Sequence, residues 1–374
     1  MQSPLIVGGG PAGAAAAIRL GWSGARPVLI ERQREVGDAI CGGFVSWRTI
    51  AALEVLGIEA DALNPMPITH VRILANGRQA EARLPAPARA VSRRRLDTLL
   101  LEQAVRAGAG VERGVGVRAI EAGELRLADG ATVRPQTMFL ATGKHDLRGA
   151  ARPAEARGRD PTLGIRVRIV PSEGMRRVLS GRIELYCFAG GYAGIVLQED
   201  GSANICMAVR QSRFDASGDP RQLLCDLGDA MPAFGDRLAT LAADTPIDAI
   251  ANVPYGWRAR DTVAGCYRLG DQAAVIPSLA GEGIGIAIAS ANAAVACWQR
   301  AGAAGASAFQ SRFASDARAP LRTAGLLRTL AEHRAGGALL VAATRAAPML
   351  ADQAARLTRI RTIPIDAAAS APHI

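Results

Sequence analysis

LIVGGGPAGAAAAIRL, residues 5–20, places three consecutive glycines between two segments of regular pattern. The apolar run before the glycines predicts a short, buried parallel strand over residues 5–7. The alanine-rich run after them predicts a helix over residues 14–20. A strand, a glycine-rich turn and a helix in this order are typical of the start of a doubly wound α/β domain, so the turn is a candidate nucleotide site.

The glycines of this turn fit the pattern GxGxxG at Gly8, Gly10 and Gly13. The first permits a tight turn, the second lets a diphosphate approach the backbone, and the third lets the helix pack closely on the strand. Pro11 and Ala12 complete the predicted site, where the helix N-terminus would face the diphosphate with unpaired N–H groups.

A second apolar run, over residues 27–30, predicts the next strand and ends at Glu31. Glu31 lies at the spacing beyond Gly13 where a carboxylate accepts hydrogen bonds from both hydroxyls of an adenosine ribose and repels a 2′-phosphate. We therefore predict an adenine dinucleotide, either NAD or FAD, held by the glycine-rich turn, Glu31 and the neighbouring Arg32.

Composition limits the function classes that remain. The chain has 374 residues, 49% of them hydrophobic, which predicts one large folded domain or two medium ones. Its six cysteines are scattered without CxxC pairs or His/Cys clusters, so we predict neither a metal site nor a disulfide framework and expect a cytoplasmic protein. The early first strand leaves no room for a secretory signal, and no apolar run of about 18 residues predicts a transmembrane helix.

The net charge of +10 comes almost entirely from arginine, because Lys144 is the single lysine. This basicity suits an acidic cofactor, an acidic carrier protein or an anionic membrane surface. Aromatic residues make up 4% of the chain and do not interleave with a basic stretch, so nucleic acid is not expected as a partner.

A second strand–turn–helix unit lies far downstream. Residues 267–274, YRLGDQAA, lead into a turn over residues 275–284, VIPSLAGEGI, and the alanine-rich run that follows predicts a helix over residues 285–299. With this unit the chain resembles the FAD-dependent oxidoreductases that include aromatic hydroxylases, flavin-dependent halogenases and geranylgeranyl reductases.

The resemblance implies specific contacts with FAD. In that superfamily a late Gly-Asp motif places an aspartate on the ribitol, and Gly270 and Asp271 match it. The following turn lies beside the flavin ring in the family, and Gly281, Gly283 and Ile284 match that turn. Backbone N–H groups there would stabilise negative charge on the reduced flavin.

Two further segments resemble the same family. Arg93, ahead of a helix predicted over residues 98–107, matches the arginine of an Arg-x-x-apolar-Asp segment that approaches FAD; a solvated helix start is the alternative. Ala141, Thr142 and Gly143 follow an apolar strand and resemble the ATG segment by which these folds return to the cofactor. The resemblance therefore favours FAD over NAD as the bound dinucleotide.

The resemblance also implies the architecture. We expect an α/β fold with a doubly wound, Rossmann-like FAD-binding domain over residues 1–151 and 251–305. An inserted α+β substrate domain is expected over residues 152–250, and a C-terminal helical cap and tail over residues 306–374. The helical segment would cover the cavity; contact with a lipid surface is the alternative, so peripheral membrane contact stays open.

Geranylgeranyl reductases form the branch of closest resemblance. Cys41, Gly42 and Gly43 match their CGG segment, in which two glycines let the backbone approach the isoalloxazine. The GEGI turn resembles that branch as well. Its Glu282 is a candidate proton donor or acceptor near the flavin, or else an acid favoured at a helix start by the helix dipole.

A predicted hairpin in the middle of the chain is the candidate substrate wall. Where reductases have Gly-Tyr-Ala-Trp-x-Phe-Pro, this chain keeps Tyr192 but has Gly194 in place of the tryptophan and Val196 near the Phe-Pro position. We expect these three residues to line a cavity of altered shape. The tryptophans of flavin halogenases are absent here, which argues against halogenation. Two later aromatic residues either wall the cavity or simply pack: Tyr255 and Trp257.

Lys144 and His145 follow the ATG-like turn, and Arg148 keeps an arginine that hydroxylases have near FAD and NADPH. Lys144 and His145 are candidates to hold the phosphate of a pyridine nucleotide or to position a substrate. His145 titrates near neutral pH and is a candidate base. The alternative is a surface loop that joins two domains.

These features predict an FAD-dependent oxidoreductase. The most favoured activity is a monooxygenase that uses NADPH or NADH and hydroxylates an apolar or aromatic molecule. A flavin-dependent reductase or dehydrogenase of a prenyl, polyketide or lipid-like substrate is the first alternative. A flavoprotein that modifies or matures a partner protein, or a carrier-bound substrate, is the second.

Overall fold

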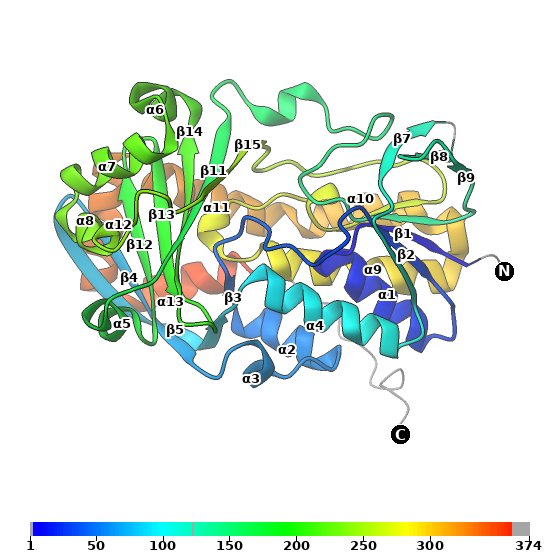
Figure 1. Cartoon of the computed structure of the whole chain (residues 1–374), viewed down its shortest axis with the longest axis horizontal. Helices are drawn as coiled ribbons and strands as arrows, with labels where there is room; N and C mark the ends of the chain where they lie inside the picture. Colours follow the sequence, from blue (N-terminus) through cyan, green and yellow to red (C-terminus); the bar gives the residue numbers. More distant parts are fainter. Residues whose placement is uncertain (1–2, 122, 361–374) are drawn as a thin grey trace.

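The computed structural model describes residues 3–121 and 123–360, and the predicted tail beyond residue 360 lies outside the described residues. Figure 1 shows two sheets at opposite ends of the molecule, with helices between and beneath them. The fold is mixed α/β, as predicted, and combines a parallel sheet, a larger sheet and a group of C-terminal helices.

A five-stranded sheet carries the glycine-rich turn. Its strands follow the order β16-β10-β1-β2-β6, and each neighbouring pair is parallel. Parallel strands are covered on both faces, which explains why β1 is apolar throughout. Helix α1 packs against both α4 and α9. The bounds are β1 Leu5–Val7, β2 Val28–Glu31, β6 Gly110–Arg113, β10 Met138–Leu140, β16 Cys266–Arg268, α1 Pro11–Trp22, α4 Arg93–Arg106 and α9 Gly283–Ala301.

Two glycines of the first turn have no room for a side chain. A Cβ on Gly8, where φ is +107°, would lie 2.5 Å from the carbonyl oxygen of Ala141. A Cβ on Gly13 would lie 1.9 Å from the carbonyl oxygen of Gly8. The helix begins at Pro11, earlier than predicted, because proline in the first helical turn gives up an N–H that has no intrahelical partner.

An eight-stranded sheet forms the other half of the molecule, in the order β15-β11-β14-β13-β12-β4-β5-β3. The predicted hairpin is present as β13 and β14, which pair antiparallel across the turn at Asp200 and Gly201. The bounds are β3 Phe44–Val45, β4 Pro67–Ala75, β5 Arg78–Ala90, β11 Thr162–Ile169, β12 Arg182–Phe188, β13 Gly191–Leu197, β14 Ala203–Arg210 and β15 Ile247–Val253.

The segment predicted as the first part of the FAD-binding domain, residues 1–151, contributes to both sheets. Strand β4 pairs with β12 in parallel register, with His70 opposite Arg182 and Leu74 opposite Tyr186. Alternating side chains reveal that a segment is a strand but not which strand is its partner. The hairpin β4–β5 therefore belongs to the same sheet as the predicted substrate domain.

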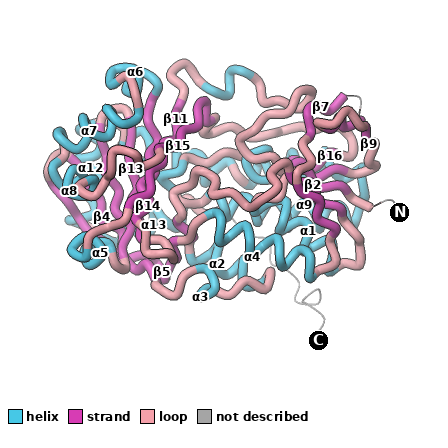
Figure 2. Tube along the Cα trace, in the orientation of Figure 1, coloured by secondary structure: helices cyan, strands magenta, loops and turns pink. Residues whose placement is uncertain are grey.

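The two faces of the large sheet have different neighbours because successive side chains alternate. On one face, Tyr186 and Ala193 pack with helices α5, α7 and α8. On the other face, Cys187 and Tyr192 pack with α12 and the end of α11. Figure 2 shows helices, in cyan, next to the magenta strands of this sheet. This second face is the one turned toward the parallel sheet and the glycine-rich turn.

The C-terminal segment is helical, as predicted. Phe309 of α10 contacts Tyr267 of the parallel sheet, with ring centroids 5.6 Å apart, so α10 is part of the cofactor half. Within residues 3–121 and 123–360, no helix combines the length and the hydropathy needed to cross a bilayer. The remaining bounds are α2 Trp47–Val55, α3 Ala60–Leu63, α5 Glu173–Leu179, α6 Gln211–Ser217, α7 Pro220–Ala230, α8 Pro232–Leu238, α10 Ala306–Asp316, α11 Arg318–Ala331, α12 Arg334–Ala346, α13 Pro348–Leu357, β7 Val117–Glu121, β8 Glu124–Leu127 and β9 Thr132–Val133.

Candidate functional site

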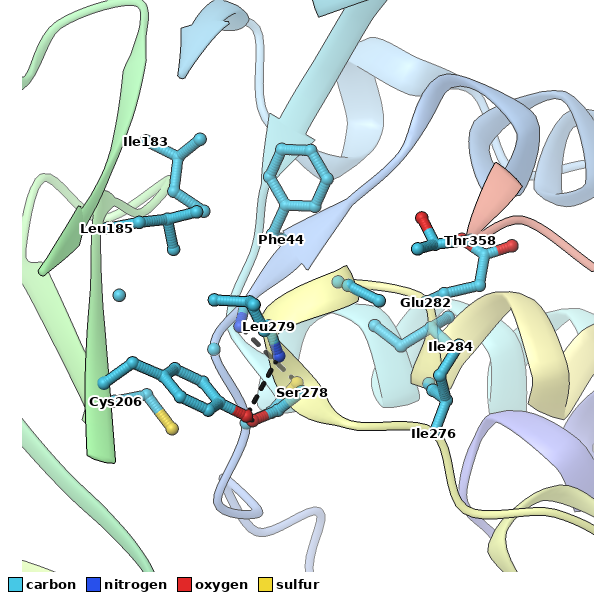
Figure 3. A pocket seen from close by; sticks show the side chains of 18 of the residues that line it. Phe44, Ile183, Leu185, Cys206, Ile276, Ser278, Leu279, Glu282, Ile284 and Thr358 are labelled. Carbon is cyan, nitrogen blue, oxygen red and sulfur yellow. Dashed lines mark hydrogen bonds between the residues drawn. The ribbon is translucent and has the colours of Figure 1, made fainter. Parts of the chain in front are cut away.

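A cavity of about 440 Å³ lies between the parallel sheet, the large sheet and the C-terminal helices. Figure 3 shows part of its wall, with strand residues on one side and the turn before α9 on the other. Its lining includes most of the residues predicted for cofactor and substrate: Gly10, Pro11, Ala12, Cys41, Gly42, Gly43, Arg93, Ala141, Gly143, Lys144, Tyr192, Gly194, Tyr255, Gly270, Asp271, Gly281, Glu282, Gly283 and Ile284.

Glu31 is held beside the glycine-rich turn, as the predicted ribose contact requires. Its Oε2 accepts a hydrogen bond from the backbone N–H of Gly9 at 2.7 Å, and its Oε1 accepts one from Gln33 at 2.9 Å. Each carboxylate oxygen has a second lone pair. The carboxylate is thus fixed at the end of β2 and retains acceptor capacity toward a ribose.

The backbone around the cavity fits a large planar cofactor. A Cβ built on Gly42, Gly143 or Gly283 would meet no atom within 4 Å, so at these three positions the main chain borders open space. Gly10 is nearly as open, because its nearest neighbour would be Nη2 of Arg93 at 3.4 Å. Bare backbone on several sides of one cavity is the arrangement that lets N–H groups reach a dinucleotide.

Arg93 brings a buried cation to this cavity. It opens α4, and its Nε and Nη2 donate to Asp97 at 3.0 and 2.8 Å. Burial lowers the pKa of Arg93, but the Asp97 carboxylate more than offsets that effect and the net shift is upward. The side chain of Arg93 is 18% exposed, which makes it largely buried, and its approach to FAD stays a prediction.

Lys144 is held against Asp271. Its Nζ donates to Asp271 Oδ2 at 3.0 Å, and this carboxylate raises the pKa of Lys144 despite the opposing effect of burial. Arg152 links the two segments, since its guanidinium donates to the backbone oxygens of Asp271 at 3.0 Å and Lys144 at 2.6 Å. The sequence pattern did not single out Arg152, because burial of an arginine cannot be read from its sequence neighbours.

His145 lies outside the cavity lining. Arg32 Nη2 donates to its Nε2 at 2.6 Å, which places the proton of the neutral ring on Nδ1. Burial, together with Arg32 and other cations, lowers the pKa of His145. The structure brings His145 and Arg32 together at the surface beside Glu31, on the ribose side of the site. Thr142 also faces this loop, and its hydroxyl donates to the backbone oxygen of His145 at 2.8 Å.

Glu282 forms a buried ion pair behind the turn. Its Oε2 accepts from Arg359 Nη1 at 2.9 Å and from Ser46 Oγ at 3.2 Å, and Glu282 is 1% exposed. Desolvation raises its pKa, and Arg359 opposes that shift. Arg359 also lies over the ring of Trp47, at 5.0 Å. Glu282 therefore has a structural partner that the sequence did not reveal, and its role as an acid or base stays a prediction.

The large sheet supplies an apolar wall with a small polar cluster. Tyr192 Oη lies 2.7 Å from Ser278 Oγ, and Tyr255 Oη donates to the same oxygen at 2.8 Å. The backbone N–H of Leu279 donates to Tyr192 Oη at 3.1 Å. Burial raises the pKa values of both tyrosines, so both stay protonated. Sequence reasoning found the tyrosines but missed Ser278, because nothing in a small-residue turn marks its contacts.

Gly194 lines the cavity and places no side chain in this wall. A Cβ there would meet Leu185 and Cys206 only at ordinary distances of 3.7 and 3.9 Å. Two other predicted wall residues do not line the cavity. Val196 packs in a separate cluster, and Trp257 lies under Arg152, with the guanidinium 5.6 Å from the ring centroid.

The loop that contains Cys41 is tied to the large sheet. Asp38 Oδ2 accepts from Arg166 at 2.9 Å and from Arg168 at 3.1 Å, and both arginines lie on β11. Further along the loop, Asn204 Nδ2 donates to the backbone oxygen of Cys41 at 3.0 Å. These contacts hold the CGG segment between the two sheets, where Gly42 borders open space.

Comparison with known proteins agrees with this geometry. Residues 2–149 match the model of the FAD binding domain family. PqsL of Pseudomonas aeruginosa, solved with 2-aminobenzoylacetate, superposes with a TM-score of 0.70 at 18% identity, covering 90% of this chain and 98% of PqsL. The peptidyl tryptophan dihydroxylase QhpG has a TM-score of 0.65 at 23% identity, covering 86% and 73% of the two chains. Halogenase PltM, solved with phloroglucinol and FAD, has a TM-score of 0.70 at 14% identity, covering 87% and 75%.

Proposed function

We propose that the chain is a monooxygenase of the FAD-dependent oxidoreductase superfamily that includes aromatic hydroxylases and flavin-dependent halogenases, because residues 2–149 match the FAD binding domain family and the fold is similar to those of PqsL and PltM. It would use NADPH or NADH as reductant and hydroxylate an aromatic or otherwise apolar molecule. One observation carries the proposal: a single cavity has bare backbone and paired cations on its cofactor side and an apolar wall with hydroxyl groups on the other.

Different residues of the site would bind different parts of FAD. The glycine-rich turn would hold the diphosphate, Glu31 the ribose, and Asp271 with Lys144 the ribitol region. Arg93 supplies a further fixed positive charge to the anionic cofactor. When bound, FAD supplies the redox chemistry, which is reduction by the nicotinamide nucleotide and transfer of one oxygen atom from O2 to the substrate.

The polar cluster on the opposite wall would orient the substrate. Tyr192, Ser278 and Tyr255 have three hydroxyl hydrogens, and the two oxygen–oxygen contacts among them use two. Hydroxyl groups can rotate, so a bound substrate would draw one of these hydrogens to its own acceptor oxygen. The apolar side chains around the cluster would keep water away from that group.

Halogenation is not favoured by the geometry of the single lysine. Lys144 lies in the lining of the cofactor side and is paired with Asp271 at 3.0 Å, rather than standing free on the substrate wall. A carrier-bound or protein-bound substrate remains compatible with the proposal, since QhpG, which has the same fold, is described as acting on a peptidyl tryptophan.

The test is oxygen labelling. The purified, FAD-loaded protein is incubated with NADPH or NADH, 18O2 and a panel of phenols, anilines and quinones, and the products are analysed by mass spectrometry. One atom of 18O in a product supports the monooxygenase. A reduced product that also forms under strict exclusion of O2 would replace the proposal by the reductase alternative.

A further inference from the structure

The apolar end of the cavity continues away from the polar cluster. In Figure 3, Ile183, Leu185 and Phe44 lie at one end of the space, and the hydroxyl of Ser278 and Cys206 lie at the other. The walls at the apolar end come from β4, β5 and β12 on the sheet side and from α12 and α13 on the helical side. The space is therefore longer than the region next to the bare glycines.

Helix α13 presents small side chains to this space. Leu350, Ala351, Ala354 and Ala355 line the cavity, and their spacing places them on one helical face. No residue of α13 is fully buried, although the helix packs against β5. An alanine-rich face that stays partly accessible leaves a channel where larger side chains would have closed it.

A second hollow, of about 450 Å³, lies next to this end of the cavity beside β5. It shares Arg83 and Leu84 with the main cavity, and its lining includes Met349 at the start of α13. Met349 is 68% exposed and Leu350 is 47% exposed. Apolar side chains that stay exposed at the opening of an apolar channel indicate entry of an apolar group.

We propose that the substrate carries a hydrocarbon chain, which lies along the alanine face of α13 while its oxygen-bearing head meets the Tyr192–Ser278–Tyr255 cluster. The inference deepens the proposed function and rests on the same cavity. Each methylene that enters the channel leaves water for apolar surroundings. Affinity then rises by about threefold to fourfold per methylene until the channel is full.

The experiment measures binding, not turnover. Calorimetric titration of the FAD-loaded protein with 4-ethyl-, 4-pentyl-, 4-heptyl- and 4-nonylphenol gives affinity against chain length. In the variant Ala354→Trp the indole occupies the channel. Ala343→Phe narrows it from α12 and serves as a second variant should the first fold poorly. Gln353→Trp, on the exposed side of α13, is the matched control.

The expected result is a steep rise in affinity with chain length for the unmodified protein and for Gln353→Trp. In Ala354→Trp or Ala343→Phe, 4-heptylphenol should bind no tighter than 4-ethylphenol, while 4-ethylphenol keeps its affinity. Three results would overturn the proposal. Affinity could be independent of chain length, Gln353→Trp could weaken binding of the long-chain phenols as much as Ala354→Trp does, or no alkylphenol could bind. If no product contains 18O but affinity still rises with chain length, the monooxygenase proposal is rejected and the proposal of a hydrocarbon channel stands.

Discussion

Lys144, the single lysine of the chain, pairs with Asp271 across 127 positions of sequence, with Nζ 3.0 Å from Oδ2. The pair joins the loop after β10 to the turn before α9, which are the two segments expected to meet the ribitol and the flavin. Its two side chains are 32% and 20% exposed, so solvent screens the attraction only in part.

A double-mutant cycle tests this pair. We expect the single variants Lys144→Met and Asp271→Ala each to destabilise the apoprotein, and the double variant to lose less than the sum of the two. A coupling free energy of about 0.5–3 kcal/mol in denaturant unfolding is the expected result. Additive losses would mean that the two groups do not interact in solution.

Glu31→Ala should loosen FAD by removing the ribose acceptor and the two backbone contacts of the carboxylate. Hydrogen bonds to a charged group are worth about 1.5–3 kcal/mol, so the dissociation constant should rise on the order of tenfold to a hundredfold. Equilibrium dialysis with FAD measures it. Glu35→Ala, an exposed acid in the same loop, is the control and should bind FAD like the unmodified protein.

Arg359→Ala should be strongly destabilising. It leaves the Glu282 carboxylate buried without its cation, which costs about 3–5 kcal/mol of the free energy of unfolding. Arg356→Ala breaks the more exposed pair that Arg356 forms with Asp352, one helical turn before it, and should change stability by no more than about 1 kcal/mol. If both substitutions lower the free energy of unfolding in urea by similar amounts, the Glu282–Arg359 pair does not stabilise the protein as a buried ion pair would.

The same pair decides the predicted chemistry of Glu282. If the carboxylate is structural, Glu282→Gln lowers the melting temperature and leaves the shape of the kcat-versus-pH profile unchanged. Loss of one limb of that profile in the variant would instead establish a proton transfer through Glu282.

Gly194→Trp should restrict the cavity. A Cβ here would already contact Leu185 and the backbone of Cys206, so an indole would have to extend into the cavity, and bulky aromatic ligands should bind more weakly while FAD content stays the same. Gly174→Trp, on α5 at the exposed surface, is the matched change. Unaltered ligand affinity in the Gly194 variant would show that β13 is not part of the substrate wall.

His145 should give stability a defined dependence on pH. Its folded-state pKa lies below the usual value near 6.5, so between the two values the unfolded chain binds more protons than the folded one. The free energy of unfolding should therefore fall as pH decreases from 7 to 5, and His145→Gln should reduce that slope. Urea unfolding of both proteins at several pH values between 5 and 7 isolates the contribution of His145. A steeper dependence of the unfolding free energy on pH in the variant would contradict the lowered pKa of His145.

Local features of the sequence were predictable because local physics produces them. The strand over residues 5–7, the glycine turn and the hairpin turn at Asp200 and Gly201 depend on periodicity and on backbone conformations that few residues adopt. The start of α4 was placed too late, at Thr98 instead of Arg93, because Ser92 caps the helix through the N–H of Arg95.

Contacts between distant segments were not predictable. Arg359 meets Glu282, Arg152 meets Asp271, and Ser278 joins two tyrosines only because the fold brings them together. An arginine in an amphipathic helix looks the same in sequence whether it is solvated or buried. The pairing of β4 with β12 escaped prediction for the same reason, since the pattern of a strand does not specify its neighbour.

The chain alternates between the parallel sheet and the large sheet, apart from the small three-stranded sheet β7-β8-β9, and this alternation has a consequence for how the molecule unfolds. The parallel sheet takes its strands from three separate parts of the chain: up to residue 31, at 110–113 and 138–140, and at 266–268. The large sheet takes its strands from the two parts between them, residues 44–90 and 162–253. Neither half is a contiguous piece of polypeptide. A single nick in any connecting loop would release no self-sufficient fragment, and the two halves are expected to melt in one transition.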